Sequence, residues 1–223
     1  QWMSQEQMAA TARFEDLASQ ESGTLVIWRN LDQIIQDGHA TEEHLAQDFE
    51  EVSKHLGLVF HRFIGRISNR IKFSMNSIPV PIFDPFLEND HGTVDKGTVV
   101  VPVSNSHVTV HSYVLPAIGK MTRNQQDKAV FDSSLRESQG FYIYRNERLL
   151  TWGTWFRTAP LSENSKLARV KVDTDKSLDS QWRLGVMKSS VEPPKVLLSA
   201  LRKLVPEITG HAERAARGRS LAV

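Results

Sequence analysis

The chain contains no cysteine among its 223 residues. Disulfide bonds and cysteine-based catalysis are therefore excluded, and the composition fits a reducing compartment, so we expect a cytoplasmic protein. No apolar run approaches the roughly 18 residues that a membrane-spanning helix needs, and residues 1–20 lack the apolar core of a signal peptide. We therefore expect no membrane association.

An excess of charge of either sign is also missing, since 27 Lys and Arg face 26 Asp and Glu and leave a net charge of +1. This balance argues against a strongly basic nucleic-acid-binding chain and against an acidic tail protein. The share of hydrophobic and charged residues is that of an ordinary globular protein. Because the chain opens with Gln1 inside what looks like folded structure, we expect it to be a piece of a longer protein.

The familiar catalytic motifs are absent as well. The sequence has no G-x-x-x-x-G-K-[ST], no G-x-G-x-x-G, no H-E-x-x-H and no G-x-S-x-G. His107 and His111 fall on the same side of a predicted strand but have no third ligand nearby, and His55 and His61 are expected at the surface or edge of a helix. We predict no metal site and no independent active site.

The apolar pattern changes along the chain. The compact run Leu25–Trp28 predicts a buried strand. From Thr41, a plausible N-cap, apolar residues recur at intervals of three and four and predict one helix, about 40 Å long if it continues to Ile67. Gly57 and Gly65 are its weak points. The apolar residues of this helix are Leu45, Phe49, Val52, Leu56, Val59, Phe63 and Ile67.

Short strands then dominate and are followed by a helix. Strands are predicted over residues 71–76, 98–103, 107–115, 140–145, 167–173 and 182–188. Residues 121–139 are polar and only loosely helical, and residues 193–208 predict an amphipathic helix. The small, basic stretch 210–223 predicts either a frayed helix or the start of a further element. Runs of strands with helices beside them predict an α+β fold.

The stretch GFYIYRNERLLTWGTW, residues 140–155, carries a high density of aromatic side chains. Alternation places Phe141 and Ile143 on one face of a strand and the tyrosines on the other. The polar residues Arg145–Arg148 predict a turn, with Asn146 suited either to local hydrogen bonds or to left-handed geometry. A ligand-stacking surface is one interpretation, but we favour a buried hairpin at the centre of a sheet, with Arg145 and Arg148 as secondary candidates for contacts at a domain or dimer interface.

Read in order, four segments resemble the GHKL ATPases, the superfamily of gyrase B subunits, MutL, MORC proteins and the ninety-kilodalton heat-shock chaperones. SGTLVIWRNLDQI is similar to the closing strand of the nucleotide-binding domain, and FEEVSKHLGLVFHRFI with IKFSMNSIPVPIFDPF is similar to the linker helix and first transducer strands. QGFYIYRNERLLTWGTW resembles a MORC-type hairpin. LARVKVDTDKSLDSQWRLGVMKSS resembles the strands that lead to the transducer lysine, whose matching position here is Lys188.

The resemblance implies residues 1–40 as the remnant of an ATP-binding domain, 41–70 as a linking helix, 71–205 as a transducer domain and 206–223 as a basic tail or a following element. The implied transducer fold is two-layered and like that of a small-subunit ribosomal protein, a mixed sheet backed by helices. In the family the lysine reaches the ATP γ-phosphate, and a lysine that follows a buried strand suits such a contact.

The chain also departs from the family. The E-x-x-x-N and D-x-G-x-G motifs are absent, and the surroundings of Lys188 differ from the N-x-x-P-x-K of MutL. The resemblance therefore implies a fragment that is not catalytic alone. ATP and Mg²⁺ would be bound by a bacterial parent ATPase, acting in DNA restriction or defence, and none is expected on this fragment. Its partners would be the missing ATPase domain, a second copy in a homodimer, or DNA.

Two other functions stay open. A DNA- or protein-binding module could use Lys120, Arg123 and Lys128, together with the basic residues Arg214, Arg217 and Arg219, as a phosphate-tracking surface. A chaperone-type middle domain would bind client proteins, although the long hydrophobic surfaces expected for that role are not evident in the sequence.

Overall fold

The computed structural model describes residues 18–27, 42–68, 71–103, 106–131, 133–174, 183–184 and 191–217, together with the single residues 4, 6, 10 and 15. The chain divides into two compact units, Gln1–Gln47 and Asp48–Val223. In the first unit, residues 23–27 form neither helix nor strand.

The buried strand predicted in the first unit is wrong for the residues that are described. Leu25, Val26 and Ile27 are 36%, 68% and 39% exposed, and Trp28 lies outside the described residues. A strand is stable when neighbouring strands pair with it, and none of the described strands pairs with this segment.

The helices of the described residues are α4 Glu42–Val59, α5 His61–Ile64, the 3₁₀ turn η1 Ile118–Lys120, α6 Arg123–Ala129 and α7 Lys195–Ala216. The strands are β1 Ser74–Met75, β2 Ile78–Pro79, β3 Val94–Val103, β4 Ser106–Val114, β5 Gly140–Arg145, β6 Arg148–Thr154, β7 Ala168–Thr174, β8 Arg183–Leu184 and β9 Val191–Glu192.

The single long helix predicted to run to Ile67 is interrupted. Phe60 leaves helical geometry, with φ −110° and ψ 16°, and separates α4 from the one-turn α5. Its ring stacks on Phe73 at 5.3 Å, a contact between distant segments that the local apolar period does not encode. The α5 turn ends at Gly65, whose N–H donates to the carbonyl of His61 at 2.8 Å.

Only the end of the predicted apolar stripe on α4 is buried. Val59 is 4% exposed, whereas Phe49 and Val52 are 46% and 48% exposed, and Leu58, which lies outside the predicted stripe, is 1% exposed. The packing of α4 into the core of the second unit therefore involves chiefly its last turn.

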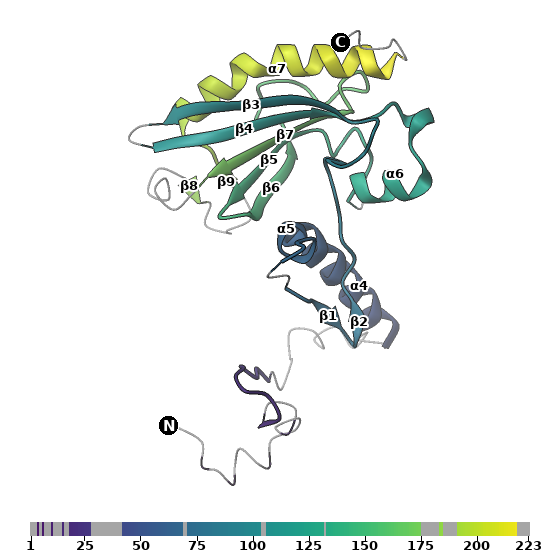
Figure 1. The fold of residues 1–223 in the computed structure, drawn as a ribbon, viewed down its shortest axis with the longest axis vertical. Coiled ribbons are helices and arrows are strands. Elements are labelled where there is room, and N and C mark those ends of the chain that lie inside the picture. The colour runs from purple at the N-terminus through teal and green to yellow at the C-terminus, as the bar shows by residue number, and fades with distance from the viewer. Residues whose placement is uncertain are drawn as a thin grey trace. The chain divides into compact units, whose positions relative to one another are not determined.

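A mixed five-stranded sheet forms the centre of the second unit, in the order β3-β4-β7-β5-β6. β5 and β7 pair in parallel, and the other neighbours pair antiparallel. Figure 1 shows this sheet with α7 across one side. The predicted α+β class, with a mixed sheet and helices, is confirmed.

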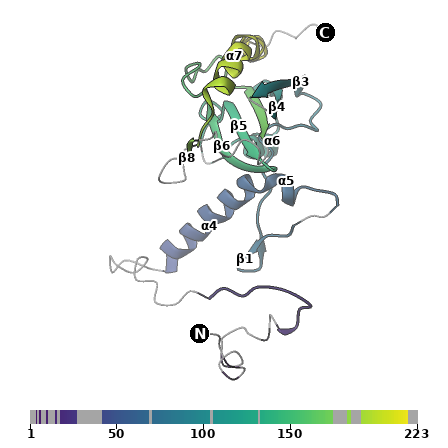
Figure 2. The same ribbon diagram turned by 90° about the vertical axis from the view of Figure 1, so that its left-hand side faces the viewer.

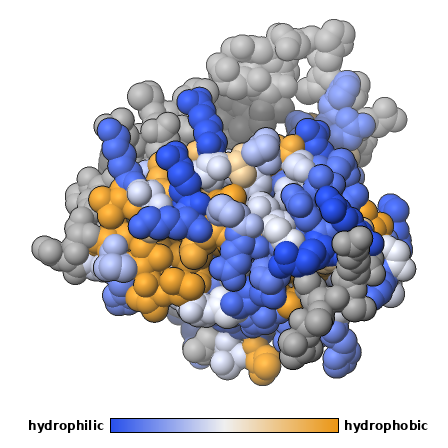
Figure 3. Space-filling view, turned by 90° about the horizontal axis from the view of Figure 1, so that it is seen from above, coloured by the Kyte–Doolittle hydropathy of each residue, from blue (hydrophilic) through white to orange (hydrophobic). Residues whose placement is uncertain are grey.

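The helix α7 covers one face of the sheet (Figures 1 and 2). Its inward residues recur at helical spacing and join a core with Val108, Val110 and Phe141. α7 continues through Pro206, so the domain boundary expected at residue 205 falls inside this helix. The view down onto this side in Figure 3 shows mostly polar side chains around an apolar area. The buried residues of α7 are Leu197, Leu201, Val205, Ile208 and Ala212.

An aromatic layer covers the opposite face. Phe86 is fully buried at its centre, and the rings of Tyr113, Tyr142 and Tyr144 lie 5.3, 5.2 and 6.2 Å from it. Leu58 of α4 belongs to the same cluster. Both faces of the sheet are thus buried at β5, which is why every side chain from Phe141 to Tyr144 is aromatic or apolar.

The predicted hairpin of residues 140–155 is confirmed as β5 and β6, with Phe141 and Ile143 in one core and Tyr142 and Tyr144 in the other. Its aromatic side chains do not form an exposed stacking surface. The expectation that it is the central hairpin is wrong, because β6 is the last strand of the five-stranded sheet.

Candidate functional site

Lys188, the residue expected to contact the ATP γ-phosphate, lies outside the described residues. It falls in sequence between β8 and β9, which pair antiparallel as Arg183 with Glu192 and Leu184 with Val191. The strand predicted through Lys188 is therefore described only over Arg183–Leu184. The role of the lysine stays a prediction.

The described residues do show a polar connection between the end of the α4–α5 segment and the sheet, which we call the helix–hairpin joint. It links α5 and the residues that follow it to β5, to the β5–β6 turn and to the end of strand β7. Its residues are His61, Arg62, Arg66, Tyr144, Glu147 and Asp173.

At the centre of the joint, the His61 Nε2 and the Tyr144 hydroxyl form a hydrogen bond of 2.8 Å. His61 is 8% exposed and Tyr144 is fully buried. The expectation that His61 lies at a helix surface is wrong, because a strand distant in sequence covers it. His55, given the same interpretation, is exposed.

Burial, with smaller contributions from the positive charges of Arg62 and Lys171, lowers the pKa of His61 to about 3. Burial also raises the pKa of Tyr144 well above its usual value. Both rings are therefore neutral at pH 7. A histidine with this pKa is a poor general base near neutral pH, so the pair acts as a structural connection rather than as an acid–base catalyst.

Two ion pairs surround this hydrogen bond. Arg62 pairs with Asp173 at the end of β7, and its guanidinium also lies 4.8 Å from the Tyr144 ring centroid. Arg66 pairs with Glu147 in the hairpin turn. All four charged side chains are partly exposed, so each pair contributes modest stability. Together they fix the direction in which α5 approaches the sheet.

The turn itself is shaped by left-handed residues. Asn146 and Glu147 have φ of 47° and 69°, which confirms the left-handed geometry predicted for Asn146. Arg145 and Arg148 lie opposite each other in the strand register on the two sides of the turn, and the Arg148 guanidinium lies 5.5 Å from the Phe60 ring centroid. Arg148 thus contacts the break between α4 and α5.

The turn is also bonded to the end of β7. The Asn146 N–H donates to the carbonyl of Thr174 at 3.1 Å, and the Thr174 hydroxyl donates to the carbonyl of Tyr144 at 3.0 Å. Thr174 is the last residue of β7, and the chain runs from it toward β8. The joint therefore holds α5, the hairpin turn and the exit of β7 together.

A cavity of about 620 Å³ lies beside the joint. Lys171 donates there to Glu88 at 2.7 Å and to the Tyr113 hydroxyl at 3.1 Å. Burial alone would lower the pKa of Lys171, but these two bonds outweigh it and the pKa is raised. Burial and the nearby Glu88 raise the pKa of Asp84, although backbone N–H groups oppose them.

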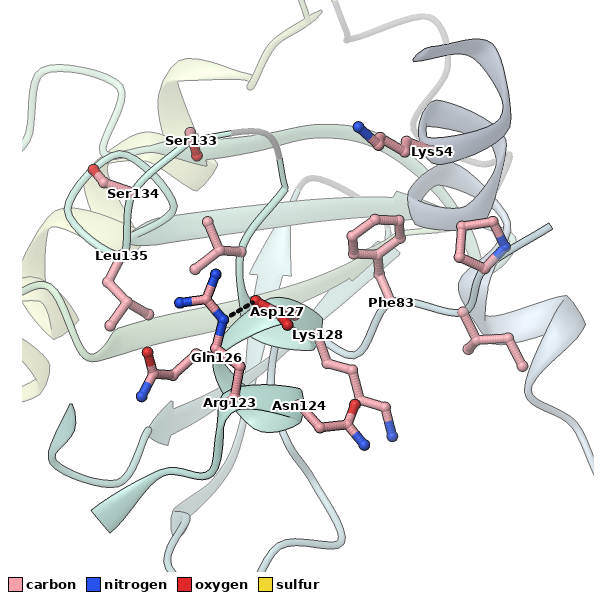
Figure 4. Close-up of a pocket in the computed structure, with 13 residues that line it drawn as sticks. Lys54, Phe83, Arg123, Asn124, Gln126, Asp127, Lys128, Ser133, Ser134 and Leu135 are labelled. Atoms are coloured by element: carbon pink, nitrogen blue, oxygen red, sulfur yellow. Dashed lines mark ion pairs between the residues drawn. The ribbon is translucent and has the colours of Figure 1, made fainter. Parts of the chain in front are cut away.

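A second hollow, of about 860 Å³, brings together two of the predicted basic residues and is shown in Figure 4. We call it the α6 groove. Arg123 and Lys128 of α6 line it together with Lys54 of α4. Arg123 pairs with Asp127 at 3.2 Å, and both side chains are exposed.

The other predicted basic residues are not gathered there. Lys120 lies on η1 and is not among the residues that line the groove. Arg214 and Arg217 are exposed at the end of α7, and Arg219 lies outside the described residues. Of the basic residues that the sequence suggested for a continuous phosphate-tracking surface, only Arg123 and Lys128 line the groove. Lys54 lines it as well.

The histidine pair on β4 has a structural explanation. His111 Nε2 lies 2.7 Å from Asp95 and its Nδ1 lies 2.8 Å from the Thr98 hydroxyl, while the ring stacks on Tyr113 at 4.3 Å. His107 is exposed. Within the described part of the chain, no group of three or more His, Asp and Glu side chains could hold a metal ion.

No family model, curated protein or solved structure matches this chain. Among the described helices, none combines the length and apolar character required to cross a bilayer. The function must therefore be argued from the residues themselves.

Proposed function

We propose that this chain is the transducer region of a bacterial GHKL-type ATPase. Its role would be to sense the ATP γ-phosphate through Lys188 and to convert ATP binding and hydrolysis into domain movement. The proposal rests on the ordered sequence resemblance and on one structural observation, the helix–hairpin joint.

The joint supports a coupling role because it connects the segments that such a movement involves. Arg62 binds Asp173, one residue before the end of β7. From that end the chain continues toward Lys188. A displacement of the segment that carries Lys188 would therefore act on strand β7 and, through Asp173 and Tyr144, on α5 and α4.

The chemical basis of the switch would be a contact that exists in only one nucleotide state. The ammonium group of Lys188 would bind the γ-phosphate of ATP and lose that partner after hydrolysis. A ligand shifts a conformational equilibrium only by its different affinity for the two states, and this contact supplies the difference. ATP and Mg²⁺ would be held by a domain with E-x-x-x-N and D-x-G-x-G motifs, to which this chain contributes Lys188.

Two experiments test the proposal. The first is to read the residues encoded immediately upstream of Gln1, where E-x-x-x-N followed by D-x-G-x-G is expected and their absence would contradict the assignment. The second is the Lys188→Ala variant of the longer protein, which should hydrolyse ATP more slowly while this chain, produced alone with the same substitution, keeps its circular dichroism spectrum.

A further inference from the structure

The α6 groove combines an apolar floor with a basic rim. Its floor is formed by apolar side chains from two separate segments, and Ile82 is 44% exposed there although it is a large hydrophobic residue. Its volume of about 860 Å³ lies within the range of roughly 300–1,000 Å³ that is usual for ligand sites. The floor residues are Pro81, Ile82, Phe83, Val130 and Leu135.

The floor is held in place by the surrounding fold. A Cβ on Gly57 would lie 2.2 Å from the carbonyl oxygen of Pro81, so α4 approaches this segment closely. The N–H of Asp84 donates to the carbonyl of Lys128 at 3.2 Å. The Phe83 ring packs against the Phe131 ring with centroids 5.5 Å apart. The hollow is thus preformed.

The rim is mostly basic and polar. The cationic side chains are those of Lys54, Arg123 and Lys128, while Asp127 is the one carboxylate among the described lining residues. Figure 4 shows Lys54 on the α4 side and the other three on α6. The Arg123–Asp127 ion pair is exposed, and exposed pairs contribute little free energy. Arg123 can therefore leave Asp127 and bind an incoming anion at small cost.

We propose that the α6 groove binds an acidic peptide segment that carries apolar side chains. The apolar side chains would lie on the floor at Ile82 and Leu135, and the carboxylates would pair with Arg123 and Lys128 at the rim. This inference goes beyond the transducer role and does not depend on it.

A nucleic-acid strand fits the same groove less well. Strands that bind without sequence preference stack their bases on aromatic side chains while cations follow the phosphates. The one aromatic residue of the floor, Phe83, is half-buried and already packed on Phe131. The remaining floor is aliphatic, which suits Leu, Ile or Phe side chains of a peptide.

The test uses this chain and a fluorescein-labelled peptide in which Asp and Glu alternate with Leu and Phe, with binding followed by fluorescence anisotropy. Two matched peptides replace the acidic residues by Lys or the apolar residues by Ser, and labelled oligo-dT is the nucleic-acid probe. The chain is tested unmodified and as R123A/K128A, I82S, D127N and, as a control on the exposed face of α7, K203A.

We expect saturable binding of the acidic, apolar peptide alone. R123A/K128A should weaken it about tenfold or more, since each tenfold corresponds to about 1.4 kcal/mol. I82S should weaken it about threefold, D127N should strengthen it, and K203A should leave it unchanged. Circular dichroism of each variant confirms that the fold is kept.

Three results would overturn the proposal. They are the absence of saturable binding of the acidic peptide, equal binding by K203A and R123A/K128A, and binding of oligo-dT as tight as that of the peptide and lost in R123A/K128A. The last result would assign the groove to nucleic acid instead.

Discussion

The imidazole of His61 and the phenol of Tyr144 are joined by a 2.8 Å hydrogen bond inside the protein, between residues 83 positions apart in the chain. One belongs to the short helix that follows α4, and the other to the strand before the hairpin turn. This bond is the buried centre of the joint through which we propose that nucleotide state is transmitted.

Removal of the Tyr144 hydroxyl should destabilise the second unit. The Tyr144→Phe substitution leaves His61 Nε2 buried without its partner, which costs about 1–3 kcal/mol. Urea unfolding of this chain, followed by fluorescence, measures the change. His107→Gln, at an exposed site on β4, is the control and should leave the free energy of unfolding unchanged. An equal effect of both substitutions would show that the buried bond contributes nothing.

His61 should also make stability depend on pH. Its folded-state pKa of about 3 lies below the usual histidine value of 6.5, so the unfolded state binds more protons between these values. The contribution is fully present above about pH 6.5 and is lost as the pH falls toward 3, by about 2 kcal/mol at pH 5.

This pH dependence can be isolated by mutation. Asp84 has a raised pKa and acts in the opposite direction, since the folded state then gains stability as the pH falls. The comparison of the unmodified chain with His61→Gln removes the contribution of Asp84. The stability difference between the two proteins should shrink from pH 7 to pH 5. A difference that is constant across this range would contradict the neutral, buried state of His61.

Gly140, the first residue of β5, should not tolerate a side chain. Its φ is +109°, and a Cβ would lie 2.6 Å from the carbonyl oxygen of Thr154. Gly140→Ala should therefore lower the free energy of unfolding by about 1–3 kcal/mol or more. At Gly119 a Cβ meets nothing within 4 Å, so Gly119→Ala should have little effect. Equal denaturation midpoints for the two variants would argue against this backbone geometry.

Local patterns predicted the hairpin well. The alternation along residues 141–144 and the turn at Asn146 are encoded within a few residues, and the structure confirms both. The break at Phe60 and the burial of His61 could not be found in the same way. Both depend on contacts with Phe73, Arg148 and Tyr144, which local periodicity does not contain.

The candidate sites show the same limit. The sequence singled out Arg123 and Lys128 for their charge, but the apolar floor beneath them comes from Pro81–Phe83 and from residues after α6. Only the fold brings these segments together. The joint residues Arg62 and Asp173 carried no motif, and their pairing across 111 positions follows from the placement of α5 beside β7.

The joint should matter for turnover as well as for stability. If nucleotide state passes through it, Arg62→Ala should slow ATP hydrolysis by the proposed parent ATPase at saturating ATP, although Arg62 is not expected to touch the nucleotide. Because both partners of the Arg62–Asp173 pair are partly exposed, we expect a small loss of stability, within about 1 kcal/mol. An unchanged rate of ATP hydrolysis in the Arg62→Ala variant would show that the joint does not transmit nucleotide state.

The most direct test of the central claim is the steady-state rate of ATP hydrolysis by the proposed parent ATPase with Lys188→Ala, measured beside Lys203→Ala. A lost charge-assisted contact of about 1.5–3 kcal/mol in the transition state corresponds to a rate at least about tenfold lower. We predict that reduction for Lys188→Ala and an unchanged rate for Lys203→Ala. Equal rates for the two variants would contradict the proposal that this chain senses the γ-phosphate.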